Sequence, residues 1–152
     1  MNNSDLKALL IQQCRTLLEE KAALFKKEME EAQSAANLEE KSSAGDKYET
    51  SRAMNQNNRD MHAKQLAEVL HALSILNSIN QDSISEKVAA GSVVFTSQAN
   101  YFIAVNSGKV EIGDQTFFVV SPLSPIAQQM LNKVTGDKFI FNNRETTITS
   151  LL

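Results

Sequence analysis

The fold of this chain is constrained most by one glycine, Gly45, in a long stretch that otherwise lacks helix-breaking residues. Apart from Gly45, roughly the first eighty residues contain no glycine and no proline, and helix-forming sequence runs on both sides of that glycine. A break of this kind between two long helical segments is typical of a chain reversal. The sequence therefore predicts an antiparallel helical hairpin with Gly45 at its tip.

The two arms of the predicted hairpin each carry an apolar seam. The first helix is expected over residues 4–40, with Ser4 or Asp5 as its cap, and would be about 55 Å long. Its small or apolar residues recur at alternating steps of three and four, the pattern of a coiled coil: Ile11, Cys14, Leu18, Ala22, Phe25, Met29, Ala32 and Ala36. The returning helix is expected over residues 46–80, with a seam through Met54, Asn58, Met61, Gln65, Val69, Ala72, Leu76 and Ile79.

Composition divides the chain into two domains, expected over residues 1–82 and 83–152. Seven of the nine aromatic residues follow residue 94. The first part carries 10 basic and 13 acidic residues, which is the whole net charge of −3, while the second part is neutral. A packed core is therefore expected mainly in the second part.

The second part changes from helical to strand periodicity. Short β-branched or aromatic runs separated by turn residues are expected to form strands over 88–96, 101–105, 109–112, 115–120, 138–141 and 146–151. Asn106-Ser107-Gly108 and Ile112-Gly113-Asp114 are predicted hairpin turns. One short helix is expected to begin with Ser124 as N-cap and Pro125 as first residue. These elements predict an α+β chain: the helical hairpin followed by a small antiparallel sheet with one helix packed on it.

Charge and hydropathy exclude several classes of function. A mildly acidic chain without a basic tract is not expected to bind nucleic acid on its own. No apolar run approaches the roughly 18 residues that a membrane span needs. The lone Cys14 has no partner for an internal disulfide. We expect a soluble cytoplasmic protein that does not associate with membranes.

Two carboxylates three residues apart, Asp46 and Glu49, follow Gly45 at the predicted tip. Asp-x-x-Glu at a helix start is a capping box, in which each side chain accepts a hydrogen bond from a free backbone N–H. The same spacing puts both groups on one face of a helix, where they could share a Mg²⁺ ion with further ligands from a partner. Both interpretations are open at this point. His62 and His71 show no spacing typical of a zinc site.

Two motifs in this order resemble those of the bacterial GreA/GreB transcript cleavage factors. The first is Gly45-Asp46-Lys47-Tyr48-Glu49 at the tip of a long helical hairpin. The second is Ser121-Pro122-Leu123-Ser124-Pro125-Ile126-Ala127, followed by Gly136-Asp137 in a small β domain. The resemblance spans nearly the whole chain. It implies that the second domain has a fold like that of the FK506-binding proteins.

The resemblance also implies a function in trans. The hairpin would enter the secondary channel of a backtracked RNA polymerase, where Asp46 and Glu49 would help hold a Mg²⁺ that the polymerase shares. The polymerase would then cleave the extruded 3′ RNA, so the protein would be an accessory factor with no catalytic activity and no cofactor of its own. Lys47 and Arg52 could neutralise RNA phosphates, and Ser121, Pro122, Ser124 and Pro125 would mark the region that docks on the polymerase. A monomer is expected.

Departures from the family pattern leave alternative functions open. The family usually continues with Asn after the acidic motif and a Tyr three residues later, whereas Thr50 and Ala53 occupy these positions here. A regulator that binds the channel without stimulating cleavage is therefore the main alternative. A peptidyl-prolyl isomerase or chaperone is a third, although a fold does not by itself carry a function.

Overall fold

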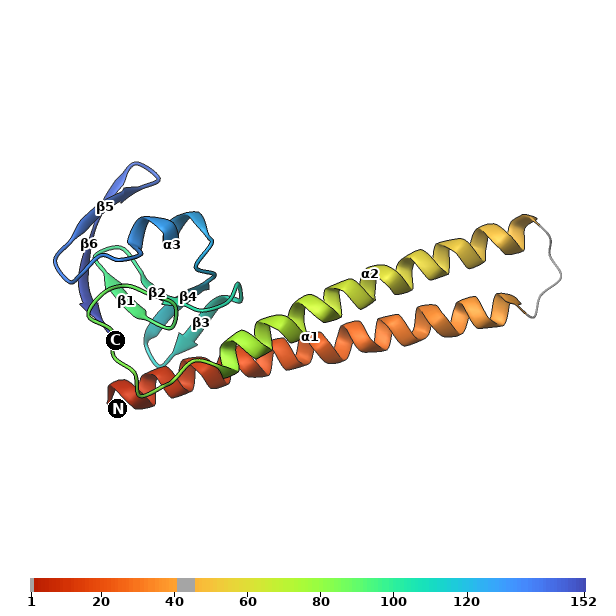
Figure 1. Ribbon diagram of the computed structural model, residues 1–152, viewed down its shortest axis with the longest axis horizontal. Helices are drawn as coiled ribbons and strands as arrows, with labels where there is room; N and C mark the ends of the chain where they lie inside the picture. Colours follow the sequence, from red (N-terminus) through yellow and green to blue (C-terminus); the bar gives the residue numbers. More distant parts are fainter. Residues whose placement is uncertain (1, 41–45) are drawn as a thin grey trace. The chain divides into compact units, whose positions relative to one another are not determined.

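The computed structural model describes residues 2–40 and 46–152, without the side chains of residues 39, 40 and 46–49. It contains two long helices, α1 (Asn3–Glu40) and α2 (Asp46–Asn77), which run antiparallel (Figure 1). A six-stranded, mostly antiparallel sheet and one short helix follow in the sequence. The predicted fold class is confirmed. Among the described residues, no helix is long and apolar enough to cross a membrane.

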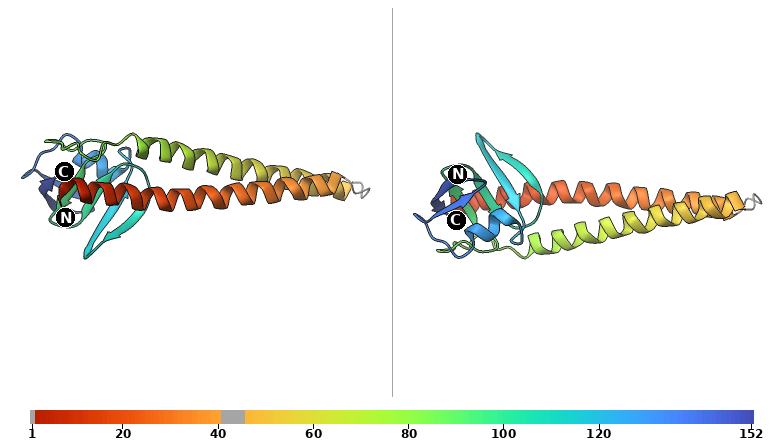
Figure 2. Two further views of the ribbon diagram at one scale, coloured as in Figure 1. Left: turned by 90° about the horizontal axis from the view of Figure 1, so that it is seen from below. Right: turned by 90° about the horizontal axis from the view of Figure 1, so that it is seen from above.

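The chain packs as two compact units. One comprises Met1–Leu17 and Ser74–Leu152, and the other comprises Leu18–Leu73. The first unit thus contains the sheet together with the start of α1 and the end of α2. The second contains the remaining two-helix arm, whose helices lie side by side in both views of Figure 2. The predicted domain division between residues 82 and 83 stays a prediction about the organisation of the chain.

Helix α1 begins with a reciprocal cap two to three residues earlier than expected. The backbone N–H of Asp5 donates to Asn2 Oδ1 at 2.8 Å, and the N–H of Asn2 donates to Asp5 Oδ2 at 3.3 Å. Both oxygens satisfy N–H groups that a helix start leaves free. The N-terminal cap is therefore Asn2 and not Ser4 or Asp5 as predicted, and Ser4 instead donates to Asp82 Oδ1 at 2.5 Å.

The segment after α2 is tied to the start of α1. Lys7 is almost fully buried, and its Nζ donates to the carbonyl oxygen of Ser83 at 2.7 Å. Burial lowers the pKa of the Lys7 ammonium. Arg15 Nε donates to Asn77 Oδ1 at 3.0 Å, close to the C-terminal end of α2. Helix α2 thus ends three residues earlier than the predicted Asn80.

The sheet follows the predicted strands closely. Its strands are β1 (Val93–Thr96), β2 (Asn100–Ile103), β3 (Gly108–Ile112), β4 (Gln115–Val120), β5 (Lys138–Phe141) and β6 (Arg144–Leu151), in the order β3-β4-β2-β1-β6-β5. The first strand starts at Val93 instead of Val88, because Gly91 has a positive φ of 91° and a turn precedes the strand.

One strand pair in the sheet is parallel, which the sequence did not predict. β2 pairs with β4 in parallel register, from Asn100 opposite Phe117 to Ile103 opposite Val120. The residues 106–108 therefore connect two strands that are not neighbours, and the prediction of a hairpin turn there was wrong. The tight turn at Gly113 is confirmed, since β3 and β4 pair antiparallel up to Ile112 and Gln115.

Both faces of the sheet are covered within the first unit. Helix α3 (Pro125–Met130) packs on one face, where the buried cluster consists of Val88, Val94, Ile103, Ile126, Ala127, Met130, Phe139 and Ile148. Because strand residues alternate between faces, Val93 and Phe102 belong to the opposite face, and both are fully buried. Cys14 of α1 lies beside Ser107 in this unit.

Candidate functional site

The acidic pair occupies the first turn of α2. This helix begins at Asp46, so Asp46 and Glu49 are its first and fourth residues. Their side chains, like that of Lys47, lie outside the described part of the structure, and so do all atoms of Gly45. The metal clamp and the capping box therefore stay predictions. Among the described residues, no group of three or more His, Cys, Asp or Glu side chains could hold a metal ion.

The basic residues of α2 beyond the tip differ in their surroundings. Arg52 is exposed. The Arg59 guanidinium forms an ion pair with Asp60 at 3.0 Å, and the two side chains are 41% and 66% exposed. Exposed pairs of this kind contribute at most about 1 kcal/mol. Arg59 is thus part of a mixed-charge helix surface, whereas the role of Arg52 and Lys47 toward RNA stays a prediction.

The inner face of the two-helix arm includes polar side chains on its α2 side. His62 is largely buried, and its Nδ1 lies 3.1 Å from Glu28 Oε2 of α1 and 3.0 Å from Gln65 Oε1. Met54 and Met61, which the predicted seam places inward, are 58% and 50% exposed. The seam prediction was wrong at these positions, because the true inner face passes one residue later. It was correct for Val69 and Leu76, which are both buried.

The predicted docking region forms the start of α3. Ser124 is the N-cap: its hydroxyl accepts from the N–H of Ala127 at 3.4 Å and donates to the carbonyl oxygen of Ser121 at 2.7 Å. The Ser121 hydroxyl accepts from the N–H of Leu123 at 3.1 Å, and Pro125 is the first residue of the helix. These contacts give the two serines a structural role. Leu123, which lies between the two serines in the sequence, is 85% exposed.

The thiol of Cys14 is buried, which disfavours its ionised form. Burial raises its pKa to about 11, and the neighbouring Ser107 hydroxyl offsets this only in part. A thiol with so high a pKa is a poor nucleophile and a poor metal ligand at neutral pH. Cys14 is therefore a small core residue, as its place in the apolar seam indicates.

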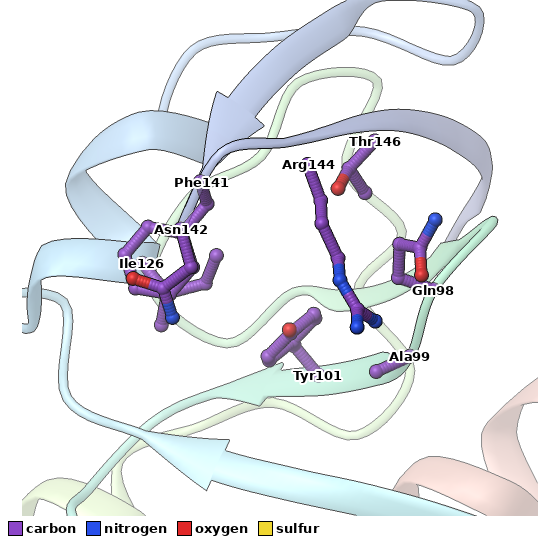
Figure 3. Close-up of a pocket in the computed structure, with 8 residues that line it drawn as sticks. All are labelled: Gln98, Ala99, Tyr101, Ile126, Phe141, Asn142, Arg144 and Thr146. Atoms are coloured by element: carbon purple, nitrogen blue, oxygen red, sulfur yellow. The ribbon is translucent and has the colours of Figure 1, made fainter.

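A cavity of about 470 Å³ in the first unit was missed by sequence reasoning (Figure 3). Its walls come from three separate segments of the chain: Gln98, Ala99, Tyr101, Ile126, Phe141, Asn142, Arg144 and Thr146. Of these, the sequence drew attention only to Ile126, as part of the motif at the helix start. No short motif connects the others, so the sequence contained no signal that could have united them.

Comparisons with known proteins give little guidance for this chain. No family model matches the sequence. No curated protein matches it either. Among solved structures, the chain is similar to one titled "Structure of the transcription factor Gfh1", with 15% identity, a TM-score of 0.35, and coverage of 98% of this chain and 92% of that chain. Identity and TM-score are too low for this likeness to support an argument about function.

Proposed function

We propose that this protein is an accessory factor of RNA polymerase. In this proposal, its two-helix arm enters the secondary channel and stimulates Mg²⁺-dependent cleavage of the 3′ RNA in a backtracked complex. The protein has no catalytic activity of its own and contacts the RNA 3′ end only inside the polymerase complex. The observation that carries the proposal is the placement of Asp46 and Glu49 in the first turn of α2, directly after the break between two long antiparallel helices.

The chemistry of the acidic pair supports action in trans. Mg²⁺ prefers oxygen ligands, and it is commonly held by one or two carboxylates together with waters and phosphate oxygens. Asp46 and Glu49 supply two such groups, and two carboxylates leave most of the coordination positions of a Mg²⁺ ion to other ligands. The pair therefore fits a shared ion better than a resident one. A shared Mg²⁺ would supply Lewis-acid stabilisation of the phosphate that is attacked.

The order of the two motifs supports the same proposal. The acidic motif at residues 45–49 precedes the motif at residues 121–127 and Gly136-Asp137, as in the cleavage factors that the sequence resembles. The second motif surrounds the start of α3, where the apolar residues Leu123 and Pro125 are exposed. In the proposal, this region of the first unit docks on the polymerase while the arm occupies the channel.

A cleavage assay on stalled, backtracked elongation complexes tests the proposal. The wild-type protein should release short 3′ RNA fragments, and the double substitution Asp46→Asn with Glu49→Gln should abolish the release while leaving the fold intact. Asp60→Asn is the matched control, since this exposed carboxylate of α2 pairs only with its neighbour Arg59 among the contacts described. Cleavage that survives in the double variant would leave the two carboxylates as helix caps.

The alternative is a regulator that binds the channel without stimulating cleavage. Thr50 and Ala53, which depart from the family pattern directly after the acidic motif, favour it. In this case the wild-type protein would compete with a known channel-binding factor for the polymerase, yet produce no RNA fragments. The two functions are thus separated by measuring competition and fragment release on the same complexes.

A further inference from the structure

The cavity beside α3 has an apolar part and a polar part. Ile126 and Phe141 lie toward one end, with the Asn142 amide beside them, and Gln98 and Ala99 lie toward the other (Figure 3). Tyr101 forms part of the floor between them. Its ring lies 6.0 Å from that of Phe118 on the paired strand, and burial raises the pKa of its phenol, so the hydroxyl stays neutral at physiological pH.

The turn between β5 and β6 fixes one wall of the cavity. Asn142 and Asn143 both have positive φ, of 52° and 64°, and join the paired residues Phe141 and Arg144. Two consecutive residues of this conformation form the tight type I′ hairpin, which matches the twist of the strands that it connects. The position of this cavity wall is therefore fixed by the antiparallel pairing of β5 with β6.

Arg144 is the one charged residue among those that line the cavity, and its guanidinium points toward Tyr101 and Ala99 (Figure 3). No ion pair or hydrogen bond of this guanidinium is found within the described part of the chain. The nearest acids in sequence are engaged elsewhere. Glu145 pairs with Lys138 at 3.3 Å, and Asp137 Oδ2 accepts from the N–H of Val134 at 2.8 Å. Arg144 is exposed to solvent, so the open cavity presents one accessible positive charge without a counterion beside apolar and aromatic surface.

We propose that this cavity binds an extended acidic peptide segment of a partner protein, with one carboxylate on Arg144 and one apolar side chain against Ile126 and Phe141. In an extended chain, residues i and i+2 face the same side about 7 Å apart, so both side chains can enter one cavity. A single guanidinium balances a single carboxylate, with which it forms bidentate hydrogen bonds. A phosphate carries up to two negative charges and is bound better by a cluster of cationic side chains. The lining residues include only one such side chain, Arg144.

The proposal goes beyond the function proposed above and does not depend on it, because the cavity shares only Ile126 with the second motif and no polymerase is needed to test it. The probe is the peptide acetyl-Ala-Phe-Ala-Glu-Ala-amide, added to the ¹⁵N-labelled full-length protein and followed by NMR. Saturable shifts are expected at the amides of Ala99, Tyr101 and Asn142. The peptide with Gln in place of Glu should bind at least about fivefold more weakly, because it loses the charge-assisted hydrogen bonds.

Substitutions at two basic positions complete the test. Arg144→Gln should remove the preference for the Glu peptide, and Arg144→Lys should keep part of it. Lys138→Gln is the matched control and should keep all of it, since Lys138 lies in the neighbouring strand but does not line the cavity. Absence of saturable shifts, or equal affinity of the wild-type protein for both peptides, would overturn the proposal. Displacement of the peptide by equimolar inorganic phosphate would assign the site to phosphate instead.

Discussion

At the scale of single residues, the buried thiol of Cys14 makes a prediction about reactivity. Its pKa of about 11 leaves roughly one thiol in a thousand ionised at about pH 8. Alkylation by iodoacetamide at that pH should therefore be about 100-fold slower in the native protein than in concentrated guanidinium chloride. Because the folded state favours the neutral thiol, the rate in the native protein should rise as the pH approaches 11. Similar rates in both states would show that the thiol is accessible.

The cap of α3 allows a second prediction at this scale. Ser124→Ala removes the oxygen that accepts from the N–H of Ala127 and should lower the free energy of unfolding by about 1 kcal/mol. Leu123→Ala is the control, because a side chain that is 85% exposed should change stability by less than about 0.5 kcal/mol. Urea denaturation of both variants measures the difference. An unchanged midpoint for Ser124→Ala would remove the structural role of the cap.

The adjacent residues Leu123 and Ser124 also distinguish a side chain that is available for docking from one that stabilises the fold. The resemblance marks a docking region at Ser121, Pro122, Ser124 and Pro125, and the structure gives the two serines hydrogen bonds that shape the turn. The turn exposes Leu123 and Pro125 to solvent. The sequence predicted Ser124 as the N-cap of α3 correctly, because this cap depends on adjacent residues. Which neighbouring side chain remains exposed depends on packing and could not be predicted in the same way.

At the scale of secondary structure elements, the β5–β6 turn carries a prediction about backbone conformation. Asn143 has φ of 64°, which asparagine tolerates and β-branched residues do not. Asn143→Val should therefore lower the free energy of unfolding by roughly 1–2 kcal/mol. Asn106→Val, at an exposed position outside the positive-φ set, should have a much smaller effect. Thermal unfolding followed by circular dichroism provides the measurement, and equal losses in both variants would contradict the prediction.

Elements were predicted better than their pairing. The bounds of β4 and β5 agree with the prediction because β-branched and aromatic runs between turn residues are a local signal. The parallel pairing of β2 with β4 was missed, since it depends on which strands meet across the sheet. The error along α2 has a similar cause. Polar residues such as His62 can line a thin two-helix arm, so hydrophobicity alone did not identify the inner face.

At the scale of the whole molecule, the two compact units should differ in local stability. Of the buried apolar residues that the structure describes, only Leu18, Ala36 and Val69 belong to the unit Leu18–Leu73. Regions with few buried apolar contacts open with a lower free energy. Hydrogen exchange followed by mass spectrometry should therefore show exchange at least about tenfold faster in residues 18–73 than in the sheet. Uniform protection across both units would contradict this prediction.

The candidate sites differ in how far the sequence could define them. The acidic pair was identified from five consecutive residues, because its spacing is a local property of a helix start. The cavity is assembled from residues 98–101, 126 and 141–146, which meet only after the sheet has formed. Nothing in the local sequence of Arg144 distinguishes it from an ordinary surface arginine.

The pairing of the first strand, β1, with the last strand, β6, has a consequence for how the chain acquires its structure. β1 is hydrogen-bonded to β6, with Thr96 opposite Ile148. The first strand of the sheet therefore cannot complete its pairing until the last strand has been synthesised. Pairing residues about fifty positions apart requires closing a large loop, which slows folding. During synthesis, β1 and β2 leave the ribosome well before their partner. The two helices, with mainly local contacts, can form earlier, and the sheet is completed only after β6 has emerged.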